Sequence, residues 1–401
     1  MLSEIVAETE SREAYPVGAM TCDRRTVWSA IYKRFINEAS NKPTMDTIQR
    51  ALFVLCLDNP VETHTTRQSK WSAIGKVIIH GVNPSEFAGN RWYDKALQFV
   101  VRVNGTAWVV YEHAPIEGIP VAAMMDWVYA KLREGVPEEV GPVSGLEKTK
   151  LTFELSDSDQ QEIDAANRNF NAVASDIELD IYTFDKFGKN FPKSKQISPD
   201  SFIQVALHVA YYKLYGTHVA QYETGTVRQY KLGRTDVIRS PHAESVAFVE
   251  AMCNFSTNSQ SDSDQTSTLS KEEKAKLLRK AVEAHKSFAV QACQGNGMDR
   301  HLLGLRTALV EAKKTLPDFY ACRAYKSLQA FVLSTSQLPC REDFIMTFGP
   351  SASNGYGICY NPQELCVHFS VTCFRSCPAT GVDKFCEALS HSLLEMRDVL
   401  L

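Results

Sequence analysis

Two spacings of apolar residues alternate along this chain, and together they predict a mixture of helices and strands. Apolar residues three and four apart indicate helices, and strict alternation of apolar and polar residues indicates half-buried strands. The helical pattern covers 23–38, 44–58, 121–134, 156–174, 199–215, 242–253, several stretches from 270 to 327, and 382–400. The strand pattern covers 97–103, 106–111, 150–154, 177–184, and much of 218–239 and 328–374. Because strands interleave with long helices and several are joined as hairpins, we expect an α/β fold with mixed sheets.

Local signals set the ends of these elements. Asn104-Gly105 predicts a two-residue hairpin turn between the strands at 97–103 and 106–111. Pro199 opens a helix that Gly216 ends, and Ser270 with Glu273 forms a capping box. Polar composition predicts loops at 59–75, at 137–144, where prolines and glycines favour a domain boundary, and at 255–268, a flexible surface insertion.

Composition narrows the class of protein. The 401 residues are enough for two ordinary domains, and 44% hydrophobic with 22% charged residues is typical of a globular protein. A net charge of -4 gives no basic surface for nucleic acid. We expect no transmembrane segment, because no apolar run is long enough. Neither an N-terminal targeting segment nor a C-terminal peroxisomal tripeptide is visible in this chain.

The cysteines predict reduced thiols and no metal site. There are 11, an odd number, and none form a Cys-x-x-Cys pair. Cys366, Cys373 and Cys377 lie close together, but no histidine spacing completes a zinc site. Scattered unpaired cysteines are typical of an intracellular protein.

His113 is the strongest catalytic candidate that the residues themselves offer. It follows the strand 106–111 and precedes an abrupt turn containing Pro115 and Gly118. A histidine on a loop carried by a stiff strand pair is well placed to face a cleft, and its ordinary pKa suits a general base. The alternative is a hydrogen-bonded histidine with only a structural role.

Eight short motifs in order give the chain a specific resemblance. They are Tyr111–Gly118, Phe187–Lys193, Ser198–Asp200, Tyr222–Thr224, Gly233–Asp236, Asp299–Leu302, Leu333–Gln337 and Asn354–Gly357. From about Tyr15 to its end the chain resembles the choline/carnitine acyltransferase family, most strongly its carnitine-specific, short-chain members. The resemblance implies two domains like chloramphenicol acetyltransferase, with carnitine entering a tunnel between them from one side and coenzyme A from the other.

Family members carry a long portion before the matched region. We therefore expect the first domain to be only partly present, over residues 1–155 with the catalytic histidine, and the second to cover 156–401 with the coenzyme A and carnitine contacts. Half a domain would leave sheet edges and apolar surface exposed.

The resemblance also assigns catalytic roles. His113 matches the general base that deprotonates either the hydroxyl or the thiol, and Glu117 lies beside it. Ser336 in the Ser-Thr-Ser run matches the donor to the oxyanion, and Ser334 belongs with the substrate contacts. Read alone, Glu117 is a surface carboxylate and the serines are polar strand residues.

Binding residues follow in the same way. Lys189 and Lys193 match contacts to the phosphate at the nucleotide end of coenzyme A, and Asp200 matches a hydrogen bond deeper in that site. Read alone, the lysines are a solvated basic loop.

For carnitine, Arg300 matches the cation for the carboxylate, with Tyr222 and Thr235 as hydroxyl partners. Phe348 matches the aromatic ring that faces the trimethylammonium group. Met346 matches the methionine that blocks the acyl pocket of short-chain members; its alternative is a core methionine filling a gap.

The expected activity is thus reversible transfer of an acetyl group between coenzyme A and carnitine. Acetyl-CoA is a co-substrate, and no permanently bound cofactor is expected. The alternatives are transfer to choline, or an inactive fragment that still binds coenzyme A. The family suggests mitochondria or peroxisomes, and a monomer is compatible with a chain whose oligomeric state the sequence does not reveal.

Overall fold

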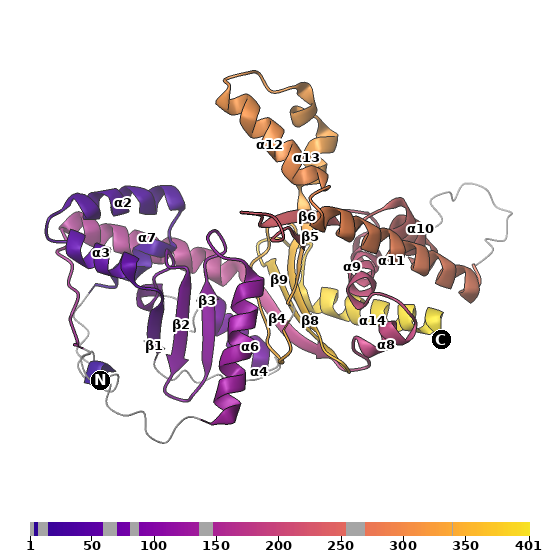
Figure 1. The fold of residues 1–401 in the computed structure, drawn as a ribbon, viewed down its shortest axis with the longest axis horizontal. Coiled ribbons are helices and arrows are strands. Elements are labelled where there is room, and N and C mark those ends of the chain that lie inside the picture. Colours follow the sequence, from indigo (N-terminus) through magenta and orange to yellow (C-terminus); the bar gives the residue numbers. More distant parts are fainter. Residues whose placement is uncertain are drawn as a thin grey trace. The chain divides into compact units, whose positions relative to one another are not determined.

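The computed structural model describes residues 4–6, 15–58, 70–80, 88–135, 147–253, 269–338 and 340–401. The chain forms two compact units, Met1–Asp176 and Ile177–Leu401 (Figure 1). The division therefore falls after residue 176 rather than between 155 and 156 as the sequence predicted. The reason is helix α7 (Asp157–Asp176), which packs against the 3-10 helix η1 (Val17–Cys22) and places Ile163 in the core of the first unit. The predicted boundary at 137–144 and the predicted insertion at 255–268 lie outside the described residues.

The first unit contains a three-stranded mixed sheet in the order β1-β2-β3. Strands β1 (Val54–Asp58) and β2 (Leu97–Arg102) run parallel, and β2 pairs antiparallel with β3 (Ala107–Tyr111). The predicted helix at 44–58 is wrong in its second half, because helix α3 (Lys42–Arg50) ends where Ala51 turns extended and β1 follows. Periodicity alone does not distinguish a short apolar run in a strand from one in a helix.

The β2–β3 hairpin is confirmed, but its turn is one residue longer than predicted. The amide of Arg102 donates to the Thr106 carbonyl, so three residues from Val103 to Gly105 form the loop. Gly105 has φ 83°, which a glycine adopts without strain. A three-residue loop that ends in a left-handed residue is the next commonest hairpin connection.

Two other predictions in the first unit are wrong. Residues 70–75, predicted as loop, begin helix α4 (Lys70–His80), whose Val77 packs with Cys56 and Trp108; residues 59–69 lie outside the described part. The segment 150–154, predicted as a strand, has no regular secondary structure. Side chains replace a strand partner there: Thr44 donates to the Thr152 carbonyl, and Asn41 bonds both the amide and the carbonyl of Glu154.

The remaining helices of the first unit agree with the sequence patterns. Helix α2 (Arg25–Asn37) buries Trp28, Ile31 and Phe35, and α6 (Gly118–Glu134) starts three residues before the predicted start. The unit also contains η2 (Ala88–Asn90).

The second unit is built on a six-stranded mixed sheet in the order β4-β9-β8-β7-β5-β6. Strands β5, β7 and β8 run parallel to one another, and the other pairings are antiparallel, which confirms the predicted mixed sheet. The strands are β4 (Ile177–Phe184), β5 (Ala220–Thr226), β6 (Thr235–Arg239), β7 (Phe331–Gln337), β8 (Tyr356–Pro362) and β9 (Val367–Phe374).

Helices cover one face of this sheet (Figure 1). Helix α9 (Pro199–Tyr215) is the most buried, and it packs between α11 (Lys271–Cys293) and α14 (Val382–Leu400) over a large apolar core. The remaining elements are α8 (Asn190–Ser194), α10 (Ala243–Cys253), α12 (Met298–Glu311), η3 (Asp318–Ala321) and α13 (Arg323–Gln329). Helices α12 and α13 extend beyond the β5–β6 side of the sheet (Figure 1).

Several local signals in the second unit are confirmed. Gly216 ends α9 with φ 62°, and Ser270 and Glu273 form the reciprocal capping box of α11. The predicted bounds of β4, α9 and α14 match those observed. Among the described helices, none combines the length and the apolar character that crossing a membrane requires.

Candidate functional site

His113 lies in the turn that follows β3, and its side chain is 59% exposed. Its Nδ1 is 3.1 Å from the carbonyl oxygen of Ile116. A carbonyl only accepts, so this contact requires the proton on Nδ1 and puts the ring's lone pair on Nε2. The turn therefore selects the tautomer that can take up a proton through Nε2.

Glu117 is held beside the histidine. It is the N-cap residue of α6, its side chain is only 12% exposed, and its carboxylate lies 3.7 Å from Nδ1 of His113. The Tyr111 ring lies 5.8 Å from the imidazole between centroids. The turn itself is closed by Glu112, whose carboxylate accepts from the amide of Ala114 at 2.7 Å. The predicted proximity of His113 and Glu117 is thus observed, and a carboxylate there stabilises an imidazolium when it forms.

The cleft that the sequence predicts for His113 stays a prediction. A cavity of about 270 Å³ opens beside the end of β3 and is lined by Tyr111 and Glu112, together with Thr21, Tyr93 and Gln98. His113 does not line it.

In the second unit, the strand register gathers three of the predicted residues, Tyr222, Ser334 and Ser336, on one face of the sheet. Tyr222, Ser334, Gly357 and Thr372 form one cross-strand row, and Ser336, Cys359 and Ser370 form the row two residues on. Residues directly opposite on neighbouring strands point to the same face. Ser334 and Ser336 are half-buried there.

Met346 and Phe348 come to the same face from the coil before β8. The hydroxyl of Ser370 donates to the Met346 carbonyl at 2.7 Å, and that of Thr372 donates to the Phe348 carbonyl at 2.8 Å. Both side chains are half-buried. This coil therefore lies against the β9 members of the two rows.

Arg300 and Thr235, both predicted for the carnitine site, are in direct contact. Nε and Nη2 of Arg300 lie 3.0 and 3.3 Å from the carbonyl and hydroxyl oxygens of Thr235. Tyr222 and Arg300 line one cavity of about 640 Å³ with Arg306, Tyr320 and Phe331. The cavity thus combines a guanidinium, a phenol hydroxyl and aromatic rings.

Lys189 is the N-cap residue of the short helix α8, and Lys193 lies in its last turn, shortly before α9. Lys189 is half-buried and Lys193 exposed. Gly188 sets their place, because a Cβ on it would lie 2.4 Å from the Gln363 oxygen and the Cys366 nitrogen. The amide of Lys189 then donates to the Gln363 carbonyl at 2.8 Å. The basic loop is therefore pinned to the turn between β8 and β9.

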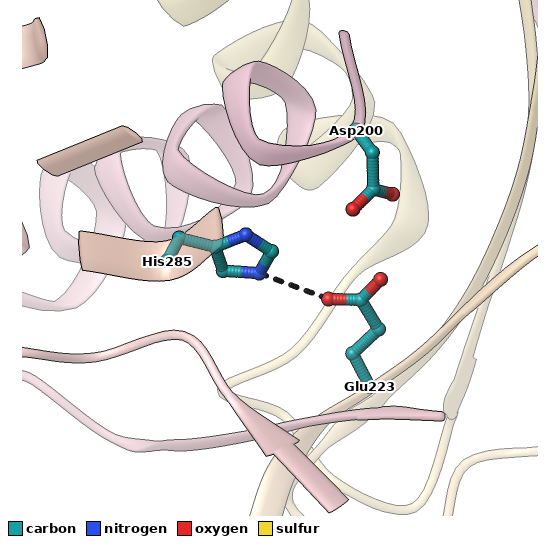
Figure 2. Close-up of side chains that lie close together, drawn as sticks. All are labelled: Asp200, Glu223 and His285. Atoms are coloured by element: carbon teal, nitrogen blue, oxygen red, sulfur yellow. Dashed lines mark hydrogen bonds and ion pairs between the residues drawn. The ribbon is translucent and has the colours of Figure 1, made fainter. Parts of the chain in front are cut away.

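Asp200 lies on the opposite face of the sheet, within a buried cluster that the sequence did not predict. Glu223 and His285 lie with it, one ligand-type atom of each being within 4.8 Å of the others (Figure 2). Nε2 of His285 is 2.9 Å from the Glu223 carboxylate, and Nδ1 is 2.9 Å from the Ser201 hydroxyl. The Tyr360 hydroxyl donates to Asp200 at 2.6 Å. Because both imidazole nitrogens are engaged, we treat the trio as a hydrogen-bonded cluster rather than a metal site.

Burial governs protonation in this cluster. Desolvation, assisted by the nearby charge of Glu223, raises the pKa of Asp200 to about 7. Desolvation likewise raises the pKa of Glu223 to about 8 and lowers the pKa of His285. Two ionised carboxylates beside a neutral imidazole would be two buried negative charges, so the cluster retains a proton near neutral pH.

A weak signal for the missed residues is present in the sequence. His285 occupies a core position of α11 together with Leu278, Ala281 and Val282, where an apolar residue would be expected. Glu223 stands in a strand whose neighbours are also polar, so alternation there does not reveal which side is buried. A polar residue inside an otherwise apolar helix face requires a buried partner, but the sequence does not name that partner.

The class of protein follows from the sequence comparison. A profile described as choline/carnitine O-acyltransferase matches residues 1–391, and the chain belongs to that family. It is 39% identical over 387 residues to the carnitine O-acetyltransferase of Columba livia, covering 96% of this chain and 59% of that protein. It is 34% identical over 402 residues to the choline O-acetyltransferase of Rattus norvegicus, covering 98% of this chain and 60% of that protein.

The chain thus spans about three-fifths of the length of the curated relatives it matches. Among solved structures, a chloramphenicol acetyltransferase aligns with a TM-score of 0.27 and 8% identity, over 55% of this chain and 88% of that one.

Proposed function

We propose that this protein transfers a short acyl group reversibly between coenzyme A and carnitine, with His113 as the general base. The observation that carries the proposal is the contact between Nδ1 of His113 and the Ile116 carbonyl at 3.1 Å, because it selects the imidazole tautomer that a base needs. Family membership and the 39% identity to a carnitine O-acetyltransferase support the same reaction.

The proposed chemistry needs no covalent acyl-enzyme. Nε2 of His113 takes the proton of the carnitine hydroxyl while the oxygen attacks the thioester carbonyl carbon. The resulting tetrahedral intermediate carries an oxyanion, which a hydroxyl donor stabilises. When the carbon–sulfur bond breaks, the imidazolium returns its proton to the departing thiolate. Glu117, 3.7 Å from Nδ1, stabilises the imidazolium between these steps.

Ser336 is the proposed donor to the oxyanion, with Ser334 contributing to the substrate site. Both lie on β7, two positions apart, and their side chains share the face crossed by the Met346–Phe348 coil. A hydroxyl on a strand is held more firmly than one on a loop, which favours a preorganised donor.

Carnitine recognition is proposed for the cavity of about 640 Å³ that Tyr222 and Arg300 line. Arg300 supplies the cation for the carboxylate, and its bonds to Thr235 hold the guanidinium in place. Phe348 is the proposed partner of the trimethylammonium group. Met346 is the proposed limit on acyl length.

For coenzyme A, we propose that Lys189 and Lys193 contact the phosphate at the nucleotide end and that Asp200 bonds further along the cofactor. The anchoring of the lysine loop through Gly188 supports a defined cation pair rather than a mobile one. In this proposal the first unit contributes the base and the second unit contributes the coenzyme A and carnitine contacts. Mitochondria or peroxisomes are the proposed compartments.

Two alternatives are open to the same experiment. The 34% identity to a choline O-acetyltransferase favours choline as the second candidate. The third candidate is a chain that binds coenzyme A without turnover. Purified protein is assayed for thiol release from acetyl-CoA with carnitine and with choline, and its melting temperature is measured with coenzyme A. We expect release with carnitine. Faster release with choline would replace the substrate, and stabilisation by coenzyme A without release would replace the enzyme by a binding protein.

A further inference from the structure

The Asp200–Glu223–His285 cluster joins two elements that carry proposed binding residues. His285, on α11, contacts Ser201 in the first turn of α9 and Glu223 on β5, each at 2.9 Å. Asp200 is the residue before Ser201, and Tyr222 is the residue before Glu223. One imidazole therefore clamps the helix turn that carries Asp200 to the strand that carries Tyr222.

The cluster is enclosed by groups that carry little charge. Tyr360 on β8 donates to Asp200, and it accepts from Gln204 at 2.8 Å. Among the described residues, His285 also interacts electrostatically with His242, just before α10, and Glu223 with Cys293, at the end of α11. In the part of the chain that the structure describes, the bonds of the three side chains go to one another and to the Ser201 and Tyr360 hydroxyls, not to lysine or arginine.

This enclosure limits the charge that the cluster can hold. Without a cation among its partners, a second buried negative charge is costly, and a proton must be shared among the two carboxyl groups and the imidazole. The position of that proton decides which atoms donate. If it leaves, Glu223 and Asp200 repel each other and the clamp between α9 and β5 weakens.

Resting on the proposed function, we propose that Glu223 and His285 are positioning residues, which hold Asp200 for coenzyme A and Tyr222 for the alcohol through a proton that the cluster shares. Coenzyme A carries several negative charges. Its binding next to Asp200 increases the affinity of the cluster for protons, because a nearby negative charge disfavours ionised carboxylates. Binding of the cofactor is therefore accompanied by proton uptake.

Calorimetric titration with acetyl-CoA at pH 7.5, in two buffers of different ionisation enthalpy, measures this uptake. We expect the wild-type protein to take up a fraction of a proton when it binds acetyl-CoA. Glu223→Gln keeps the shape of the side chain, so this variant should still bind acetyl-CoA but without the proton uptake. His285→Ala should weaken binding, and His285→Gln should restore part of it, because its amide can reach Glu223. His208→Gln is the matched control, because His208 is 1% exposed and hydrogen-bonded to His218, outside the cluster. The proton uptake of this variant should equal that of the wild type.

Ser201→Ala gives a milder test if the buried substitutions prevent folding, since it removes only the hydroxyl partner of Nδ1 and should reduce the uptake. Binding with the same proton count in the wild type, Glu223→Gln and Ser201→Ala would overturn the positioning roles while leaving the proposed function intact. Absence of acetyl-CoA binding to the wild-type protein would instead overturn the proposed function, and the positioning roles with it.

Discussion

Arg239 and Asp299 form a buried ion pair in which two guanidinium nitrogens contact the two carboxylate oxygens at 2.9 and 2.6 Å. The pair joins β6 to the first turn of α12, and the Arg239 guanidinium also lies 4.8 Å from the centre of the Phe331 ring. Asp299 directly precedes Arg300. A buried ion pair therefore lies beside the cavity of about 640 Å³. It fixes the start of α12 and, with it, Arg300, the proposed carnitine-binding residue.

Replacing Asp299 with alanine should destabilise the second unit strongly, because Arg239 would be left as an uncompensated buried charge. A loss of roughly 3–5 kcal/mol in the free energy of unfolding is expected for breaking such a pair. Urea denaturation followed by circular dichroism measures it. The exposed Lys42–Asp46 pair is the control, and Asp46→Ala should change stability by less than about 1 kcal/mol. Equal effects of the two substitutions would contradict the structural role of the buried pair.

His113→Ala should remove acyl transfer and leave coenzyme A binding unchanged. Loss of a general base costs about 10²–10⁴-fold in turnover. The assay follows thiol release with carnitine, and a thermal shift with coenzyme A tests binding. His391, exposed on α14, provides the matched control, whose alanine variant should keep the wild-type rate. Turnover in His113→Ala within a fewfold of the wild type would remove the imidazole from the mechanism.

Arg300→Asn should raise the KM for carnitine far more than the KM for coenzyme A, because the substrate carboxylate loses its charged donor. A hydrogen bond to a charged group is worth about 1.5–3 kcal/mol, or roughly 10- to 100-fold in KM. Arg306 lines the same cavity and is the matched comparison. If Arg306→Asn had the larger effect on carnitine, the carboxylate would bind Arg306 rather than Arg300.

Met346→Gly should extend the range of acyl groups. Removing a half-buried side chain beside the serine-bearing face opens space there, and we expect the ratio of octanoyl to acetyl transfer to rise by about tenfold or more. Competition between octanoyl-CoA and acetyl-CoA in one assay measures the ratio directly. An unchanged ratio would leave Met346 as a gap-filling residue without a role in selectivity.

The cluster around Glu223 should make stability fall as pH rises. The folded pKa values of Asp200 and Glu223, about 7 and about 8, lie above the ordinary values of unfolded carboxyl groups, so the folded state binds more protons than the unfolded state between them. Their contribution is full at acidic pH and is lost as pH rises through about 8. The slope reaches about 1.4 kcal/mol per pH unit for each proton.

Measurement between pH 6.5 and 8.5 isolates this effect from the histidines. Burial lowers the pKa of His208 to about 3, so that residue's contribution to stability is lost only as pH falls below the ordinary histidine value. Glu223→Gln should flatten the slope in urea denaturation across this window. A variant with the wild-type slope would show that the proton is held elsewhere.

Element type was predictable where a long pattern had clear ends. β4, α9 and α14 have the predicted bounds because a long single period was delimited by proline, glycine or a charged turn. The prediction of a helix over 44–58 failed because a short apolar run fits either structure, and β1 pairs with β2, whose Gln98 lies 44 residues after Val54. The prediction of a strand over 150–154 failed because the side chains of Asn41 and Thr44, at the start of α3, hydrogen-bond its backbone in place of a neighbouring strand.

Within the candidate site, the sequence motifs indicate contacts between their own residues. The His113–Glu117 and Thr235–Arg300 contacts lie within or between quoted motifs. The partners of Asp200 were not predictable, because Glu223 and His285 come from elements that only the tertiary fold brings together. Nor could the sequence tell that Tyr111 and Glu112 line a cavity to which His113 does not contribute, since side-chain direction in a turn depends on backbone angles that no period encodes.

Strand β5 places a phenol and a carboxyl group on consecutive residues that point to opposite sides of the sheet. One peptide bond therefore links a residue on one face of the sheet to a residue on the other. Which residue faces which side depends on the alternation of side chains along the strand. A deletion or insertion of one residue upstream in β5 would exchange them, burying Tyr222 under α9 and α11 and turning Glu223 toward the guanidinium of Arg300. A substitution on this strand changes either the cavity lined by Tyr222 or the buried cluster that contains Glu223. A shift of one position would disable both.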